Sequence, residues 1–133
     1  MTAMNKRILA DTSVWVEFFR PTSAKGKELE KLLMDSAVWT CGTVLFELAQ
    51  GVKSETEKKY ILNIFAGLPY VEMTASLWLK AGTLAASLKR SGLTLPNSDI
   101  FIATLAIENN LSIFTLDKHF EQIPGVKLHK SAS

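Results

Sequence analysis

Four acidic residues stand at matched positions in the pattern of strands and helices that the sequence predicts. Asp11 directly follows the first predicted strand and Asp117 the fourth, while Asp99 falls in the first turn of a helix. Glu47 falls in the early turns of the helix after the second strand. In a parallel α/β sheet, the carboxyl ends of strands and the amino ends of the following helices share one edge, where such folds bind ligands. We therefore expect the four carboxylates to converge there.

Each of these acids also has a purely structural interpretation. Asp11 suits a helix N-cap, and Asp99 suits a first helical turn, where the helix dipole favours a carboxylate. Asp117 is a common type of turn residue, and Glu47 shares a helical stripe with polar neighbours. Taken singly, these interpretations compete with a functional site. Independent solvation does not explain four acids on one edge of so short a chain, so the conjunction favours a common site.

Clustered carboxylates indicate a divalent cation. Like charges held close together raise one another's pKa, and a bound cation relieves their repulsion. The sequence offers oxygen ligands at this edge, with no cysteine there and no pair of histidines at ligand spacing. Such a set favours Mg²⁺ or Mn²⁺ over zinc or copper. A carboxylate-bound Mg²⁺ that keeps several waters suits phosphate chemistry.

The elements that would position these acids alternate along the chain. Short apolar runs predict buried strands at 7–10, 37–40, 70–72, 112–115 and 126–128. Apolar residues at helical spacing predict helices through 14–19 and at 24–34, 43–50, 55–66, 74–90 and 98–109. Strands separated by helices need crossover connections, which give a mostly parallel sheet covered on both faces. We therefore predict an α/β sandwich.

The composition predicts one folded domain, residues 1–133. The chain is 47% hydrophobic and 21% charged, which excludes a disordered or collagen-like chain. Its one cysteine, Cys41, excludes an internal disulfide framework and fits a reducing compartment. No apolar stretch approaches the roughly 20 residues of a membrane span. The start, Met1–Arg7, is not followed by the apolar core of a secretory signal, so a cytoplasmic location without membrane contact is expected.

The modest net charge of +2 conceals a basic surface outside the acidic cluster. Of the 13 acidic residues four belong to the cluster, which leaves 9 against 15 basic residues. Such a surface can meet a phosphate backbone. Lys53 and Arg90 are candidate contacts, with solvated helix faces as the alternative. Trp15 and Trp39 lie in apolar runs and are predicted to pack in the core, whereas Trp78 is a candidate to stack on a base.

Three runs and one acid occur in an order that is shared with a known family. They are ILADTSVW at 8–15, Glu47, SDIFIATLA at 98–106 and LSIFTLDKHF at 111–120. Together they resemble PIN-domain ribonucleases, and among these the small toxins of bacterial VapBC toxin–antitoxin pairs. The resemblance covers nearly the whole chain. It implies a PIN-like three-layer α/β/α sandwich with a mostly parallel sheet of four to five strands.

The resemblance also implies an activity and a catalytic quartet. The family's members are Mg²⁺- or Mn²⁺-dependent endoribonucleases that hydrolyse RNA phosphodiester bonds with a metal-activated water. Asp11, Glu47 and Asp99 match the family's core acids, and Asp117 matches its more variable fourth. These four are therefore the expected catalytic and metal-binding residues. Hydroxyls that help to hold the site are expected from three positions: Thr12, Ser13 and Thr115.

Partners follow from the same resemblance. Some relatives carry a basic residue where this chain has Leu116, so Lys118 is expected to contact RNA in its place, together with Lys53 and Arg90. Family members commonly form homodimers, and apolar helix surface at 61–68 and 77–88 is the candidate interface. The toxins are inhibited by a small VapB-like antitoxin, whose tail covers the active site. A homodimer and such an antitoxin are therefore the expected partners.

Three alternatives accompany this interpretation. A phosphoacceptor receiver domain would have paired acids after the first strand, where Asp11 stands alone. A haloacid-dehalogenase-like phosphatase would have a second aspartate where Ser13 stands. A PIN nuclease that processes RNA without being a toxin differs only in its partners. In every case His119 and His129 are expected to be surface or loop histidines without a partner.

Overall fold

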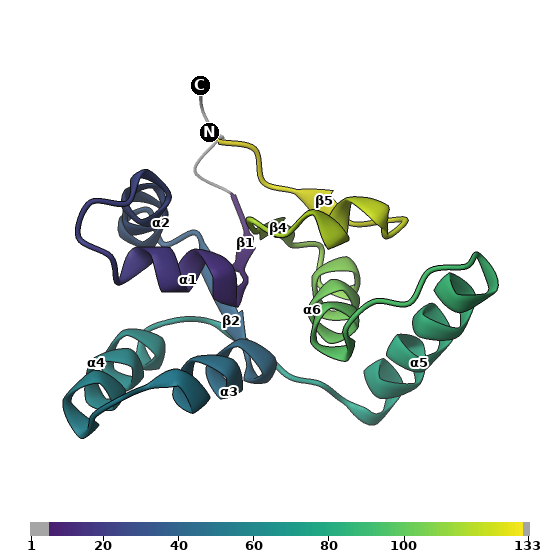
Figure 1. Cartoon of the computed structure of the whole chain (residues 1–133), viewed down its shortest axis with the longest axis horizontal. Coiled ribbons are helices and arrows are strands. Elements are labelled where there is room, and N and C mark those ends of the chain that lie inside the picture. The colour runs from purple at the N-terminus through teal and green to yellow at the C-terminus, as the bar shows by residue number, and fades with distance from the viewer. Residues whose placement is uncertain (1–5, 132–133) are drawn as a thin grey trace.

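Five short runs of apolar residues form one sheet at the centre of the protein (Figure 1). In the computed structural model, which describes residues 6–131, the strands are β1 (Ile8–Ala10), β2 (Val38–Cys41), β3 (Tyr70–Val71), β4 (Ser112–Phe114) and β5 (Lys127–Leu128). The two ends of the predicted domain, residues 1–5 and 132–133, lie outside the described residues, as does most of the segment Met1–Arg7. Every strand pair is parallel, so the prediction of a mostly parallel sheet of four to five strands is confirmed.

The strand order β3-β2-β1-β4-β5 places β1, the first strand in the sequence, at the centre of the sheet. The chain builds outward from β1 through β2 to β3, and then returns to the other side of β1 with β4 and β5. The direction of winding therefore reverses between β1 and β4. The carboxyl edge beside such a reversal is where open α/β sheets bind ligands.

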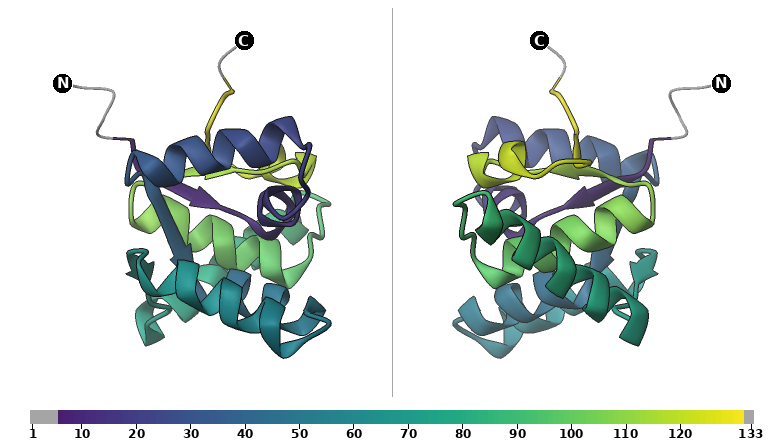
Figure 2. Two further views of the ribbon diagram at one scale, coloured as in Figure 1. Left: turned by 90° about the vertical axis from the view of Figure 1, so that its left-hand side faces the viewer. Right: turned by 90° about the vertical axis from the view of Figure 1, so that its right-hand side faces the viewer.

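Six α-helices cover the sheet: α1 (Thr12–Phe18), α2 (Ala24–Met34), α3 (Gly42–Gly51), α4 (Glu55–Ala66), α5 (Ala75–Arg90) and α6 (Asn97–Glu108). In Figure 1, α1 and α2 lie on one side of the strands and α5 and α6 on the other. The side views show α2 at one end and α3 with α4 at the other (Figure 2). Helices therefore shield both faces of the sheet, which explains why the central strand β1 is entirely apolar and buried.

The core forms between the central strands and the helices that cover them. All three residues of β1 are buried, and so are Val14 and Trp15 of α1. Trp15 packs against Phe65 of α4 with ring centroids 4.8 Å apart, which confirms its predicted core position. Trp39 is half-buried and packs against the same core, under the guanidinium of Arg7. Within the described residues, no helix has both the length and the apolar character needed to cross a membrane.

A glycine allows α1 and α2 to approach each other closely. A Cβ atom added at Gly26 of α2 would lie 2.4 Å from the carbonyl oxygen of Glu17 and 2.9 Å from the Cα atom of Phe18. Both are backbone atoms, so a side chain at this position cannot be accommodated by a change of rotamer. The contact matters for the site, because α1 carries Thr12 and Ser13 at its amino end.

We therefore predict that Gly26→Ala lowers the free energy of unfolding by about 1–3 kcal/mol, the usual cost of overpacking. Gly82→Ala is the matched control, because Gly82 lies within α5 and a Cβ atom there meets nothing within 4 Å. That change should raise stability by about 0.5–1 kcal/mol, since alanine is the better helix former. Urea unfolding of the two variants measures both effects. Equal effects of the two substitutions would contradict the close approach of α1 and α2.

Candidate active site

The four predicted acids lie along the carboxyl edge of the sheet, at the point where the winding reverses. Asp11 follows β1, and its backbone N–H donates to the carbonyl of Phe114 at the end of the neighbouring β4, at 3.0 Å. Asp117 follows β4 and precedes a short 3-10 helix, η2 (Lys118–Gln122), which the sequence did not predict. Asp99 lies in the first turn of α6, and Glu47 lies on α3.

Asp11 is held by hydroxyl and backbone donors on both oxygens. Its Oδ1 accepts hydrogen bonds from the backbone N–H and the hydroxyl of Ser13, which makes Asp11 the N-cap of α1. Its Oδ2 accepts from the hydroxyl of Thr115 at 2.6 Å. The Thr115 oxygen in turn accepts from the backbone N–H of Asp117 at 2.9 Å. One threonine therefore links the loop after β1 to the loop after β4.

Burial and hydrogen bonding act in opposite directions on Asp11. The residue is only 5% exposed, and this burial raises the pKa of its carboxyl. Hydrogen bonds from Ser13 and Thr115 offset part of that increase in pKa, because they stabilise the charged form. The carboxylate thus keeps its orientation through donors supplied by the protein itself.

Glu47 is oriented by the hydroxyl of Thr12, whose Oγ1 donates to Glu47 Oε1 at 2.5 Å. The two neighbouring hydroxyls at the start of α1 therefore serve different acids, Ser13 holding Asp11 and Thr12 holding Glu47. All three hydroxyls named from the sequence, at Thr12, Ser13 and Thr115, bond to one of the four acids.

A histidine joins the other two acids, and this contact corrects the sequence interpretation. His119 Nδ1 lies 2.8 Å from Asp99 Oδ2 and 3.1 Å from Asp117 Oδ1. Asp99 and Asp117 each offer one carboxylate oxygen and His119 offers one imidazole nitrogen, and these three atoms all lie within 4.8 Å of one another. The prediction of a partnerless His119 is therefore wrong. The same prediction is wrong for His129, whose Nε2 lies 3.0 Å from Glu28 Oε2.

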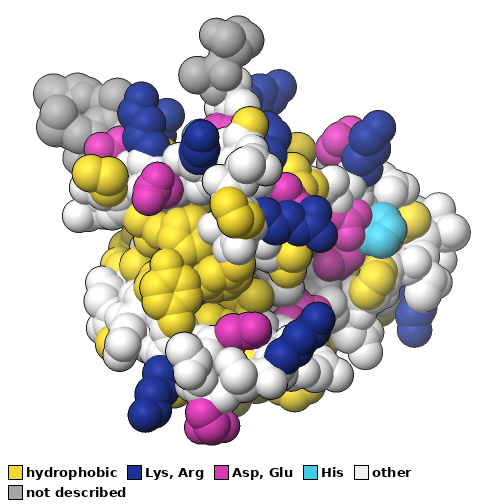
Figure 3. Space-filling model, turned by 60° about the vertical axis from the view of Figure 1, so that its left-hand side comes forward, with side chains coloured by type: hydrophobic (Ala, Val, Ile, Leu, Met, Phe, Trp, Pro, Cys, Tyr) yellow, Lys and Arg dark blue, Asp and Glu magenta, His cyan; other side chains and the backbone are white. Residues whose placement is uncertain are grey.

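The electrostatics of this group reflect crowded negative charge. Burial raises the pKa of Asp99, and the nearby carboxylates of Asp117 and Glu47 raise it further, while the hydrogen bond with His119 opposes them. The pKa of His119 is itself raised, chiefly by its hydrogen bond with Asp99 and further by the negative charge of Asp117. Glu47 and Asp117 thus both act electrostatically on Asp99. Figure 3 shows an exposed histidine against a group of acidic side chains, beside a hydrophobic area.

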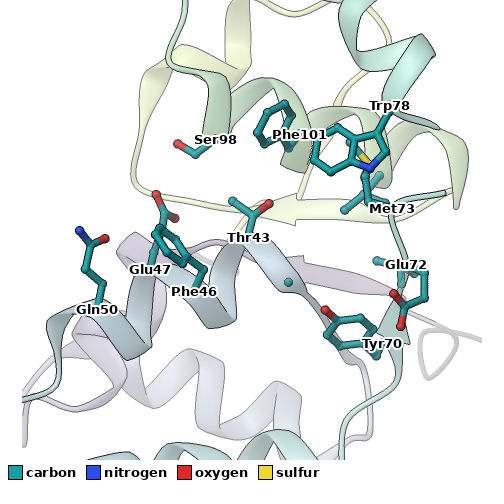
Figure 4. A pocket seen from close by; sticks show the side chains of 13 residues that line it. Thr43, Phe46, Glu47, Gln50, Tyr70, Glu72, Met73, Trp78, Ser98 and Phe101 are labelled. Carbon is teal, nitrogen blue, oxygen red and sulfur yellow. The ribbon is translucent and has the colours of Figure 1, made fainter. Parts of the chain in front are cut away.

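A hollow of about 420 Å³ opens beside Glu47, between α3, the amino end of α5 and α6 (Figure 4). The Glu47 carboxylate extends from α3 toward Ser98 at the start of α6 (Figure 4). Trp78 is 51% exposed on the far wall and packs edge-on against Phe101, with centroids 5.0 Å apart. The hollow offers aromatic surface next to the acids, and Trp78 occupies the accessible position that base stacking requires.

The three basic residues predicted to contact RNA are placed differently. Lys118 lines a second hollow, of about 680 Å³, which shares Thr115 and Asp117 with the acidic site. Lys53 follows the end of α3, and Arg90 occupies the last turn of α5. In residues 6–131, the side chains of Lys53 and Arg90 form no hydrogen bond or ion pair with the four acids. Lys118 is therefore the basic residue of the three that borders the site.

A parallel α/β fold with carboxylates gathered at its winding reversal defines this protein as a PIN-type domain. The PIN domain family model matches residues 8–126, and the chain belongs to the PIN-domain family. Its relatives place it with the VapC type. It is 29% identical over 131 residues to the VapC ribonuclease Mb1587 of Mycobacterium bovis, covering 95% of this chain and 98% of that protein. Family membership sets aside the receiver-domain and phosphatase alternatives.

Further relatives agree with this assignment. Ribonuclease VapC1 of Methanocaldococcus jannaschii is 28% identical over 127 residues, covering 92% of this chain and 87% of that protein. Among solved structures, the DNA-bound VapBC from Salmonella typhimurium superimposes with a TM-score of 0.77 at 22% identity, covering 93% and 97% of the two chains. The predicted PIN-like fold is thereby confirmed.

The pKa directions at the site predict that the metal-free protein loses stability as the pH rises from about 6 to about 8. Because the pKa of His119 is raised above its ordinary 6.5, its stabilising contribution is complete below that pH and is lost as the pH rises through the raised value. Asp99 has the same sign of effect, but its destabilising contribution begins at lower pH, where the unfolded-state carboxyl ionises near its ordinary pKa of 3.8. Urea unfolding in a chelator, at both pH values, measures the difference.

The pH difference in stability should shrink in His119→Gln and persist in His129→Gln, whose ring contacts Glu28 instead. An equal pH dependence in the parent and in His119→Gln would show that the contact between His119 and the two aspartates does not stabilise the fold.

Proposed function

We propose that this protein is a divalent-cation-dependent endoribonuclease and the toxin of a toxin–antitoxin pair. The observation that carries the proposal is the convergence of Asp99, Asp117 and His119 within 4.8 Å, with Glu47 acting on the same group. Curated relatives that match nearly their full length are named ribonuclease, which supports RNA as the substrate. The proposal treats residues 1–133 as one nuclease domain in the cytoplasm, with Cys41 buried and free of any disulfide.

The donor set at the site fits a divalent cation. Asp99 and Asp117 offer carboxylate oxygens within 4.8 Å of each other, and burial followed by the negative charge of Asp117 and Glu47 raises the pKa of Asp99, a cost that a cation relieves. These two residues would hold Mg²⁺ or Mn²⁺, with Glu47 and Asp11 as the remaining acids of the quartet. A cation so held supplies Lewis acidity toward a phosphate and lowers the pKa of a bound water.

The other residues have roles that follow from their contacts. Thr115 keeps Asp11 and the backbone of Asp117 in one arrangement, because its oxygen bonds to both. Glu47, whose Oε1 is held by Thr12, would accept a proton from a water or from the substrate with its second oxygen. Lys118 lines a hollow together with Asp117 and would bind a phosphate of the RNA there. Preorganised groups of this kind lower the barrier by positioning and by electrostatics.

Substitutions at the site should separate ligands from supporting residues. Asp99→Asn should reduce RNA cleavage by more than about 100-fold, since it removes a proposed ligand. Thr115→Val should reduce cleavage by roughly 10–100-fold, the usual cost of losing a partner that orients a ligand. Asp35→Asn is the control, because Asp35 is the exposed C-cap of α2 and should keep full activity. Cleavage of a single-stranded RNA with Mg²⁺, and again in EDTA, measures these effects.

Thermal melts with and without Mg²⁺ test the same ligands through protein stability, so their result does not depend on which RNA is used as the substrate. Metal-free Asp99→Asn should be at least as stable as the parent, because it removes a buried like charge. Added Mg²⁺ should stabilise the parent and Asp35→Asn by linkage, and should stabilise Asp99→Asn much less. Full activity of the parent in EDTA, or an undiminished Mg²⁺ shift in Asp99→Asn, would contradict the proposal.

An antitoxin partner is supported by an exposed apolar area on α1 and α4. Three large side chains there are exposed: Val16, Phe19 and Tyr60. Phe19 and Tyr60 pack edge to face, and a hollow lined by Phe19 also reaches Glu47. Contiguous exposed apolar surface marks a protein interaction site. Several similar structures are of VapBC complexes, such as VapBC2 from Rickettsia felis with promoter DNA. A partner segment in this hollow would lie against the site.

A homodimer is supported by a second exposed apolar area, on α3 and α5. Leu79 is 74% exposed, Phe46 66% and Trp78 51%, and the last two line the hollow beside Glu47. Trp78 and Leu79 fall within the stretch 77–88 that was predicted to form the interface. In the stretch 61–68, Ile61 and Phe65 are buried instead and serve the core.

We therefore predict that Leu79→Glu converts a homodimer into a monomer without loss of the fold. A charge at the centre of an apolar interface is left without solvation on association. Met34→Glu is the control, since Met34 is 81% exposed at the end of α2, and it should leave the dimer intact. Light scattering at high protein concentration measures the mass. A monomeric parent would contradict the prediction outright.

A further inference from the structure

His119 is set against two buried or half-buried acids at separations that are close enough for a shared cation. Its Nδ1 lies 2.8 Å from an Asp99 oxygen and 3.1 Å from an Asp117 oxygen. Adjacent ligands of an octahedral cation with bonds of about 2.1 Å lie about 3.0 Å apart. The imidazole nitrogen therefore already has the spacing of a neighbouring ligand to each carboxylate oxygen, and the atoms that the three residues offer all lie within 4.8 Å of one another.

The backbone fixes the imidazole in this place. The N–H of His119 donates to Asp117 Oδ1 at 2.9 Å, so the carboxylate of Asp117 caps the 3-10 helix that carries the ring. Asp99, 20 residues earlier in the sequence, reaches the same ring from α6. The side chain of His119 is 43% exposed, which leaves the open side of the group accessible to an ion from solvent.

We propose that His119 is a direct ligand of the divalent cation through Nδ1, and that the site consequently prefers a first-row transition cation such as Mn²⁺ over Mg²⁺. This inference rests on the proposed function and deepens it. Mg²⁺ binds almost entirely through oxygen ligands, whereas first-row transition cations readily accept imidazole nitrogen. Two carboxylates and one imidazole make a mixed set, in contrast to the all-oxygen set that the sequence alone indicated.

The competing interpretation gives His119 the opposite effect. If the ring only balances the charge of Asp99 and Asp117 in the metal-free protein, it must leave before a cation enters. Removal of the ring would then raise the affinity for both cations. Removal of the His119 ring therefore lowers the cation affinity if the ring is a ligand and raises it if the ring is only a counter-charge. The sign of the change in affinity decides between the two.

The test uses the full chain as the parent, His119→Gln and His119→Asn, with His129→Gln as the matched loss of a histidine that contacts Glu28 and not the four acids. Mn²⁺ binding is followed by loss of the free-ion EPR signal, and Mg²⁺ binding by calorimetry, both at about pH 8. Pulsed EPR of the Mn²⁺ complex reports nitrogen ligands through their ¹⁴N coupling. Circular dichroism confirms that each variant is folded.

We expect ¹⁴N coupling in the parent and in His129→Gln, and its loss in both His119 variants. Affinity for Mn²⁺ should fall by at least about tenfold in those variants, with a change of less than about threefold for Mg²⁺. Equal losses for the two cations, a gain for either, or ¹⁴N coupling that survives in the His119 variants would overturn the inference.

The same measurements separate this inference from the proposed function. A parent that binds both cations without ¹⁴N coupling, and whose cleavage is lost in Asp99→Asn, retains the function and overturns only the role of His119. A parent that binds neither cation overturns both.

Discussion

Repulsion among carboxylates at the end of the central strands is the constraint around which this protein is built. Asp11, Asp99, Asp117 and Glu47 are brought to one edge by the order of the strands, and burial makes their charge costly. Each of the four accepts compensating hydrogen bonds or ion pairs, from distant segments for Asp11, Glu47 and Asp99 and from the neighbouring His119 for Asp117. The hydroxyls at the start of α1, the threonine after β4 and the imidazole of η2 all serve this purpose.

The four acids differ in how many protein donors neutralise their charge, and this difference separates Asp11 from Asp99 and Asp117. Both oxygens of Asp11 accept hydrogen bonds from protein donors that cannot easily leave, since they include the backbone N–H groups at the start of α1. Asp99 and Asp117 instead share a single, partly exposed imidazole. The carboxylate of Asp11 is therefore held rigidly, with both oxygens hydrogen-bonded. On the second side of the site, Asp99 and Asp117 retain negative charge that the protein does not neutralise. The second side is therefore the one that would attract the cation proposed for this site.

Much of this could be predicted from the sequence, because helices and buried strands have local signatures. The helices at 24–34 and 55–66 have the predicted ends, and the other elements differ by a few residues at most. The two interpretations of Asp11, as a helix cap and as a site residue, turned out to be compatible. His119 escaped prediction because its partner Asp99 is 20 residues away, and their contact depends on how α6 packs beside a 3-10 turn that has no periodic pattern.

The central position of β1 has a consequence for the order in which the protein is made. β1 is synthesised first, yet one of its two edges stays open until β4 emerges, and β4 begins only at Ser112. Thr115, Asp117 and His119 follow within seven residues of that point. A chain still on the ribosome, or one cut short before β4, contains Asp11, Glu47 and Asp99 without Thr115, Asp117 and His119, which complete the acidic cluster. The acidic cluster is thus completed only after the segment that follows β4 has been made.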